Sequence, residues 1–527
     1  MKSLRVAASA FAIGLLAAGL TAPAPALSQT LTIGLRSGTD ALDPHFGSLG
    51  NSVSVIRNIY DTLVSRDETL APTPSLAVAW KLIDDNIWEF DLRPGVKFHD
   101  GSDFTADDVK YTIERVPNAQ GPTGGMMLYM TGISKVEVIS PLKVRLITST
   151  PTPLLPRNLA QIFILPKSLG TPTQEDFQSG KATIGTGPYK YVSWQPKGDL
   201  VVARHDAYWG GKQPWERIVM KEILADQSRV AALLAGDVDL INYVPSVDVE
   251  QLKKNATVAV FQTPSVYNFM VYPEVGRDQS PFVTDADGKP MTKNPMKDIR
   301  VRQAMSMAIN RQAIVDRVMH GQGIAAGQLS PDGLWATSTA LKPDKFDPDG
   351  AKKLLTEAGY PNGFGITLHC SSDRLPNDAA VCTALGGMLN RIGIKAIVAA
   401  TPRAVFFPAS ARLEYSLQMS GWGSLSGETS YILQSLVHTL DNNKRLGANN
   451  RTMYSNPKLD ALIETAITTV DDEKRKAMLI EAMEMSIKDY STIPVVTLNA
   501  IWAGRKDKVS YAARNDEETN VLQMQKP

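Results

Sequence analysis

The first 28 residues determine where this chain folds. Lys2 and Arg5 precede an apolar run from Val6 to Leu20, and small residues and prolines follow up to Ser28. This is the three-part layout of a secretory signal peptide. The apolar run is shorter than the roughly 20 residues that a permanent membrane span needs. We expect cleavage after Ser28, with Ala26 as the alternative, and a mature chain that is free and soluble outside the inner membrane.

The charge of the mature chain is nearly balanced. The signal segment carries two of the 55 Lys and Arg and none of the 54 Asp and Glu, which leaves a formal net charge of −1. Because phosphate binding needs a clustered positive excess, we expect no nucleic-acid partner. A hydrophobic content of 43% is typical of a globular protein. About 500 residues are too many for one core, so two or three domains are expected.

Two cysteines, Cys370 and Cys382, occur in the whole chain. In an oxidising compartment a nearby pair can form a disulfide. The alternative is two separately buried thiols, and a geometry that the sequence does not contain decides between them. Both possibilities stay open at this point.

Strand and helix patterns alternate along the whole chain. Residues 31–35 and 87–92 have the apolar or alternating pattern of strands. Thr105–Asp108 has the pattern of a capping box that begins a helix. Asp298 and Asn310 are predicted N-caps of two successive helices. No change of composition marks a linker, so we expect α/β lobes between which the chain can cross more than once.

One segment is similar to a catalytic motif. The Gly-Ser-Leu-Ser-Gly stretch of Gly423–Gly427 is similar to the G-x-S-x-G pattern of serine hydrolases. His438, Asp441 or Glu428 could be its partners, although His438 precedes Asp441 and the usual order is serine, acid, histidine. Glycine and serine are common loop residues, so a secreted serine hydrolase is a minor alternative.

The chain carries no strong signal for a metal or a cofactor. Asp285–Gly288 is similar to a calcium loop, but Met296 stands where the closing glutamate would be. The six histidines are dispersed, at positions 45, 99, 205, 320, 369 and 438. We therefore expect neither a metal nor a cofactor, and the sequence favours a binding protein over an enzyme.

Six segments in order over nearly the whole mature chain resemble one family, the family 5 solute-binding proteins of ABC importers. This family includes dipeptide- and oligopeptide-binding proteins. The strongest segment is the first, and the six are Trp88–Val109, Gly185–Tyr189, Asp206–Trp209, Ile299–Arg311, Ala351–Pro361 and Tyr454–Pro457.

The resemblance implies the type II periplasmic-binding-protein fold in its large, three-subdomain variety. This is a bilobal α/β protein with a hinge and a ligand cleft between the lobes. Residues 29–58, 182–268 and 492–527 would form the core of lobe I, and residues 59–181 an extra subdomain of that lobe. Residues 269–491 would form lobe II.

The resemblance also points to a missing acid. In peptide-binding relatives an aspartate shortly after a Gly-Trp pair holds the α-amino group of the ligand. The pair here ends at Trp422, and the matching position is Leu425. A buried ammonium needs a paired charge. Ordinary free-amine dipeptides are therefore expected to bind weakly, unless Glu428, Asp40 or Asp373 supplies the carboxylate.

Five further residues are candidates for the ligand site. Dipeptide-binding relatives use an arginine for the ligand carboxylate, and Arg374 or Arg403 is the counterpart here. Trp422 is predicted to project at the end of a strand, and Tyr267 and Asn268 lie where relatives cross between the lobes. Such aromatic and polar groups can line a pocket. For each of them a role in the core or at the surface is the alternative.

We therefore predict a monomeric solute-binding protein that captures peptides or peptide-like solutes and delivers them to an inner-membrane ABC permease. The lobes are expected to close over the ligand because it touches both of them in the closed state. The alternative is the same role for a non-peptide ligand, such as an opine, a sugar derivative or a metal chelate.

Overall fold

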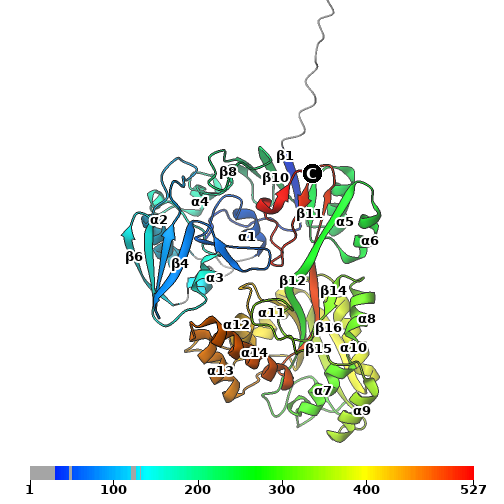
Figure 1. The fold of residues 1–527 in the computed structure, drawn as a ribbon. Helices are drawn as coiled ribbons and strands as arrows, with labels where there is room; N and C mark the ends of the chain where they lie inside the picture. The colour runs from blue at the N-terminus through cyan, green and yellow to red at the C-terminus, as the bar shows by residue number, and fades with distance from the viewer. Residues whose placement is uncertain (1–29, 47–49, 120–125, 131) are drawn as a thin grey trace, which may run out of the picture.

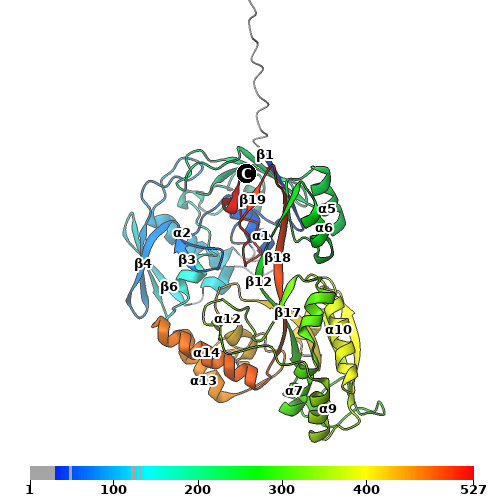
Figure 2. The ribbon, with the colours of Figure 1, turned by 45° about the vertical axis from the view of Figure 1, so that its right-hand side comes forward.

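The computed structural model describes residues 30–46, 50–119, 126–130 and 132–527. It has two lobes joined by two long antiparallel strands, β12 (Val258–Pro273) and β18 (Ile493–Arg505), which cross from one lobe to the other (Figures 1 and 2). We use lobe I for residues 29–268 with 492–527 and lobe II for 269–491, the division proposed from the sequence. The predicted signal peptide lies outside the described residues.

One mixed sheet of 12 strands runs through both lobes. Its order is β13-β15-β17-β12-β18-β11-β1-β10-β9-β8, with β14 beside β18 and β16 beside β15. The predicted strand at residues 31–35 is β1, which pairs in parallel with β10 and β11. A parallel strand covered on both faces is apolar throughout, and the side chains of Leu31, Ile33 and Leu35 are buried.

Lobe I consists of a core and an extra subdomain. The extra subdomain has a four-stranded sheet of order β4-β5-β7-β6, which Figure 1 shows at one side of lobe I. Both predictions for this region are confirmed. The strand at 87–92 is β5, and Thr105 with Asp108 forms the capping box of α2.

The core elements are β1 (Thr30–Leu35), α1 (Gly50–Ile56), β8 (Tyr189–Trp194), β9 (Leu200–Arg204), β10 (Arg217–Glu222), α5 (Asp226–Ala235), β11 (Leu240–Asn242) and α6 (Val249–Lys254). The elements of the extra subdomain are β2 (Val64–Arg66), β3 (Pro72–Pro74), β4 (Ala77–Asp84), β5 (Ile87–Leu92), α2 (Ala106–Arg115), β6 (Ile133–Ser140), β7 (Lys143–Thr148), α3 (Leu155–Leu159) and α4 (Gln174–Gln178).

Lobe II packs helices around its half of the sheet. The side chains of Asp298 and Asn310 cap α7 and α8 as predicted, and α8 continues as a π-helix over Ile314–Val318. The elements are β13 (Val283–Thr284), α7 (Ile299–Ala308), α8 (Arg311–Ala313), β14 (Gly323–Ala325), α9 (Pro348–Glu357), β15 (Phe364–Ser371), α10 (Asp378–Arg391), β16 (Ile394–Thr401), α11 (Arg403–Ala411), β17 (Leu417–Gly423), α12 (Ser430–Ile432), α13 (Pro457–Thr468) and α14 (Asp472–Lys488). Two short strands near the C-terminus, β19 (Ser510–Tyr511) and β20 (Met524–Gln525), pair with each other in lobe I.

Each lobe has a hydrophobic core of its own. One cluster of buried apolar side chains lies within residues 31–240 and 500–524, and another within 269–498. Separate cores of this kind allow two lobes to move as bodies about a short connection. Within the described part of the chain, no helix is both long enough and apolar enough to cross a membrane.

Candidate ligand-binding site

The strand β17 carries Trp422 to the junction of the two lobes. Trp422 lies one residue before the end of β17, as the sequence predicts, and its half-buried ring stacks on Tyr431 with centroids 5.8 Å apart. Among the described residues, nothing bonds the buried indole Nε1–H of Trp422. A buried donor without a partner is costly, so this N–H is suited to an acceptor on a ligand.

Tyr267 lies beside Trp422 on the neighbouring strand. In the register of β12 against β17, Tyr267 is opposite Gly423. A Cβ atom at Gly423 would stand 2.7 Å from the Tyr267 ring, so the ring occupies the space above this glycine. Burial raises the pKa of Tyr267 to about 12; Glu517 adds to this rise and Arg374 opposes it. Groups of both charge signs therefore lie near this hydroxyl.

Arg374 reaches the same region from the loop after β15. Its Nη1 donates to the carbonyl of Gly421 at 2.9 Å, and its guanidinium carbon lies 5.0 Å from the centroid of the Phe407 ring. Arg403, the other predicted arginine, is exposed at the first residue of α11, where its backbone N–H donates to Asp373. The structure thus brings Arg374, and not Arg403, next to Trp422.

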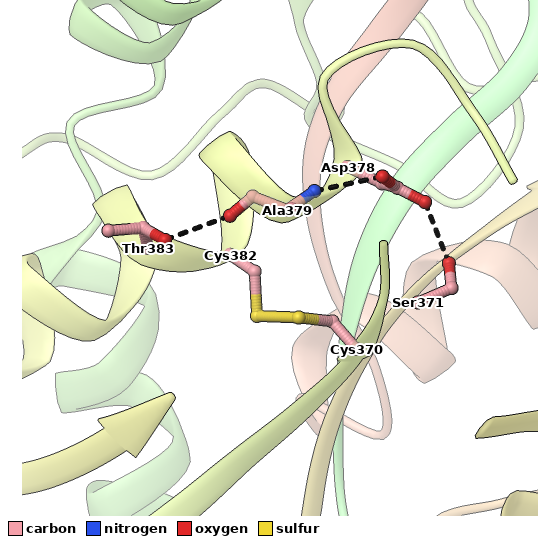
Figure 3. The surroundings of a disulfide bond; sticks show 6 residues. All are labelled: Cys370, Ser371, Asp378, Ala379, Cys382 and Thr383. Atoms are coloured by element: carbon pink, nitrogen blue, oxygen red, sulfur yellow. Dashed lines mark hydrogen bonds between the residues drawn. A yellow bond between two sulfur atoms is a disulfide. The ribbon is translucent and has the colours of Figure 1, made fainter. Parts of the chain in front are cut away.

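A disulfide and a buried carboxylate hold the loop that carries Arg374. Cys370 at the end of β15 is bonded to Cys382 in α10, with Cα atoms 6.5 Å apart (Figure 3). Asp378 accepts hydrogen bonds from the Ser371 hydroxyl at 2.8 Å and from the backbone N–H of Arg374 at 3.0 Å. Both constraints order the loop before a ligand arrives, which lowers the entropic cost of binding.

Asn268 belongs to the framework rather than to the cleft. It is fully buried, and its amide donates to the carbonyls of Gln328 and Leu329, at 3.0 Å each. Its Oδ1 accepts from the Thr497 hydroxyl at 2.7 Å. With three hydrogen bonds inside the protein, this amide ties the hinge strands to lobe II, so the sequence assignment to the ligand was misplaced.

Glu428 is not available to a ligand either. It is fully buried, and Nη1 of Arg475 contacts both carboxylate oxygens, at 2.7 and 2.9 Å. Nε of Arg157 lies 3.3 Å from Oε2, and the Ser430 hydroxyl also donates to this carboxylate. Arg157 comes from lobe I, whereas Arg475 and Glu428 belong to lobe II. The sequence prediction that Glu428 could hold a ligand ammonium is therefore wrong, because two guanidinium groups already neutralise it.

Leu425 contributes apolar surface and a backbone contact. Its half-buried side chain packs with Leu70, Val266 and Leu334, and its carbonyl accepts from Arg66 at 2.9 Å. Leu70 and Arg66 lie in lobe I, so the loop after β17 touches that lobe directly. The two other predicted acids, Asp40 and Asp373, are exposed.

The proposed catalytic constellation is not assembled. The middle position of the G-x-S-x-G pattern is Leu425, so no serine stands at the nucleophile position. The neighbouring Ser424 is fully buried and bonded to Ser330 at 3.0 Å. His438 instead contacts Glu464, at 3.1 Å. The described residues also contain no group of three or more His, Cys, Asp or Glu that could hold a metal ion.

Sequence reasoning missed three residues at this junction: Tyr129, Tyr431 and Glu517. Tyr129 comes from lobe I, and burial, followed by the Tyr431 hydroxyl, raises its pKa. Tyr431 stacks on Trp422 from α12. Isolated tyrosines have no motif that marks them, and Glu517 stands in a run of three acids near the C-terminus.

Two lobes on a pair of hinge strands, with an indole N–H that no described residue bonds where they meet, are the architecture expected of a solute-binding protein. The family model of the bacterial extracellular solute-binding proteins, family 5 (middle), matches residues 71–444. The chain belongs to this family, whose members serve as solute-binding components of ABC importers. Its recognition from the six sequence segments and the bilobal fold expected from it are confirmed.

The comparisons with individual proteins agree with this assignment. The glutathione-binding protein GsiB of Pectobacterium atrosepticum is 27% identical over 516 residues, with 95% of this chain and 96% of the relative covered. Among solved structures, DppA of Helicobacter pylori in complex with the peptide STSA has a TM-score of 0.74 at 22% identity, covering 94% and 98% of the two chains. NikZ of Campylobacter jejuni in complex with Ni(L-His) has a TM-score of 0.77 at 23% identity, covering 95% and 100%. Those two ligands differ, so the shared fold does not select a ligand.

Proposed function

We propose that this protein captures a peptide or peptide-like solute between its lobes and delivers it to an inner-membrane ABC permease. The observation that carries the proposal is the buried indole N–H of Trp422, which none of the described residues bonds, beside Tyr267 and Arg374. A donor and a guanidinium suit the carbonyl and carboxylate groups of a peptide. Tyr431 and Leu425 add apolar walls, and pockets for small molecules combine both kinds of surface.

The relative that binds glutathione gives this ligand class a concrete member. Glutathione is a modified tripeptide with free carboxylates and one amine, so it offers partners for both Arg374 and the Trp422 N–H. We propose it as the first compound to test. Micromolar affinity, about −8.2 kcal/mol, would suit capture followed by release to a transporter.

We further propose that the mature protein is a periplasmic monomer that begins near Gln29. The basic, apolar and small-residue segments of residues 1–28 support export. N-terminal sequencing of the protein from a periplasmic extract made without detergent tests this. Retention of Met1 on a membrane-bound species would contradict it.

A non-peptide ligand is the second candidate, and Leu425 favours it. Its apolar side chain packs with Leu70, Val266 and Leu334 at the position where peptide-binding relatives carry an acid. Such a surface suits a ligand whose amine is blocked, absent or differently placed, as in an opine or a sugar derivative.

Mass spectrometry of small molecules released from gently purified protein separates the two candidates. Calorimetry with the identified compound, or with glutathione and a dipeptide panel, then tests the site. We expect Arg374→Gln to weaken a carboxylate ligand about 10- to 100-fold, since charge-assisted hydrogen bonds are worth about 1.5–3 kcal/mol. Arg403→Gln is the matched control and should change nothing, because Arg403 is exposed. Equal effects of the two substitutions would refute the site.

A further inference from the structure

A small cavity lies beside the hinge strand β18. This strand pairs with β14 over Val496–Leu498 and with β11 over Trp502–Gly504, so Asn499–Ile501 face a gap between the two partners. The cavity there has a volume of about 20 Å³, counted as the space that the centre of a water molecule can occupy. One water needs about 10–15 Å³ by this measure, so a group the size of an ammonium fits. Residues of both lobes line the cavity, among them Tyr243, Ser246 and Glu517 from lobe I and Gln322 and Pro376 from lobe II.

Glu517 differs from the acids on either side of it. Asp516 pairs with Arg514 at 2.7 Å and with Arg66 at 3.2 Å, and Glu518 pairs with Arg57 and Arg66, at 2.7 Å each. Glu517 faces the cavity instead, and no described lysine, arginine or histidine lies within 4.0 Å of its carboxylate. Burial raises the pKa of Glu517, and hydrogen bonds from the Ser265 and Tyr243 hydroxyls, together with the charge of Arg36 beyond 4.0 Å, oppose this rise. The protein therefore compensates the charge of this carboxylate only in part.

Gln322 is a second acceptor in the same cavity. It is 4% exposed, and its Oε1 is bonded to none of the described residues. A buried acceptor that no described residue bonds and a carboxylate without an ion pair lie in one small cavity, and together they suit a cationic donor with several N–H groups.

The cavity adjoins the residues proposed to bind the ligand. The Ser265 hydroxyl donates to Glu517 at 2.5 Å and accepts the backbone N–H of Tyr267 at 3.2 Å. Pro376, which lines the cavity, follows Arg374 by two residues. A further link crosses between the lobes, where Asn377 donates to Ser246 at 2.8 Å. A carboxylate and an arginine thus lie on two sides of Tyr267.

We propose that the cavity at Glu517 and Gln322 binds a primary ammonium group of the ligand. The site would replace the acid that Leu425 lacks, and it would hold the amine from lobe I and the hinge rather than from the loop after β17. The class of ligand is then a zwitterion with its amine at Glu517 and its carboxylate at Arg374. This inference rests on the proposed function, because it assigns a further group of the same ligand.

Calorimetry with free-amine ligands and their N-acetylated forms tests the site. The probes are glutathione and a dipeptide panel, with wild type, Glu517→Gln and Gln322→Leu. We expect N-acetylation to weaken binding to wild type about 10- to 100-fold. Glu517→Gln should weaken the free amines by a similar factor and abolish the discrimination, and Gln322→Leu should weaken them less. Glu250→Gln, an exposed acid of α6 in lobe I, is the control that should leave both affinities unchanged.

The possible outcomes separate this inference from the proposed function. If peptides bind and Glu517→Gln still discriminates against acetylated forms, the ammonium site is wrong and the peptide-binding function stands. If no peptide binds, the ligand class is wrong, and methylammonium chloride then decides about the cavity. Compared with equal potassium chloride, methylammonium should raise the thermal midpoint of wild type and not that of Glu517→Gln. An equal response of the two proteins would overturn the inference.

Discussion

Glu428 and Glu517 are two carboxylates at the junction of the lobes, and they differ in the charged groups that surround them. Glu428 is fully buried between Arg475 and Arg157, which come from different lobes. Glu517 accepts from the Ser265 hydroxyl at 2.5 Å and from the Tyr243 hydroxyl, and the charge of Arg36 acts on it from beyond ion-pair distance. The Glu428 carboxylate links lobe II to lobe I. The Glu517 carboxylate makes no such link between charged groups, and we propose that it binds the ligand.

The difference teaches how to separate structural acids from ligand-binding acids. Burial alone does not, since Glu428 is fully buried and the half-buried Glu517 is also desolvated enough to raise the pKa of its carboxyl group. The number of cations that the protein itself supplies does, because a buried charge needs a partner from somewhere. Where the protein supplies two guanidinium groups, as at Glu428, the carboxylate is already neutralised and does not need a cation from a ligand. Where no described cation lies within ion-pair distance, a cationic ligand would complete the proposed site.

The largest effect should follow from Glu428→Gln. This change leaves Arg475 and Arg157 without their shared carboxylate, and breaking a buried ion pair costs about 3–5 kcal/mol. We expect the free energy of unfolding, measured by urea denaturation, to fall by about this amount. Glu250→Gln is the control, since its pair with Lys253 is exposed and such pairs are worth about 0–1 kcal/mol. Equal losses in both variants would remove the contrast between Glu428 and Glu517.

Arg157→Gln should have a smaller effect on stability and a larger one on shape. Arg475 would still neutralise Glu428, but the ion pair between the lobes at 3.3 Å would be lost. Arg157 also donates to the carbonyl of Ser426 in lobe II, at 3.2 Å. Charged hydrogen bonds of this kind are worth about 1.5–3 kcal/mol, enough to shift an equilibrium between open and closed lobes about tenfold or more.

X-ray scattering of the ligand-free protein measures this shift. We expect a larger radius of gyration for Arg157→Gln than for wild type. The control is Arg145→Gln, because Arg145 pairs with Glu89 at 2.9 Å inside one sheet of lobe I. If the radius stays the same, the contact does not hold the lobes together. A saturating ligand should make both wild type and Arg157→Gln more compact.

The fold was largely predictable because its signals are local. Thr105 with Asp108, Asp298 and Asn310 each act within one turn of a helix, and all three caps are present. The six family segments extended these signals to the whole fold. The position of Trp422 at the end of a strand was also predictable, since an apolar strand pattern ends beside it.

The site was less predictable because its partners lie far apart in the sequence. Glu428 meets Arg157 across 271 positions of the chain, and no local pattern indicates that pair. Glu517 and Tyr267 are likewise joined through Ser265 by the C-terminal segment folding back on β12. For the same reason the sequence predicted Glu428 as a candidate acid and gave no indication of Glu517. It shows which residues are acids, but not which of them the protein has already neutralised.

The smallest effect should come from Glu517→Gln without a ligand, and its dependence on pH identifies the cause. Burial raises the pKa of Glu517 in the folded protein above its ordinary value. Glu517 therefore favours folding at low pH, and this contribution is lost as the pH rises through the raised pKa. Glutamine resembles the protonated form and does not titrate. The stability of Glu517→Gln relative to wild type should thus increase with pH, measured by urea denaturation between about pH 5 and 8.

A bound free-amine ligand should instead favour wild type over Glu517→Gln as the pH rises. Its ammonium would favour the ionised carboxylate, so the affinity of wild type should rise as the pH increases through the pKa of Glu517. The affinity of Glu517→Gln should stay flat over the same range, as should that of wild type for the N-acetylated ligand. Because Glu428 stays paired with Arg475 throughout, substitutions there cannot produce this pattern. A wild-type affinity for free amines that does not change with pH would leave Glu517 a structural acid like its neighbours.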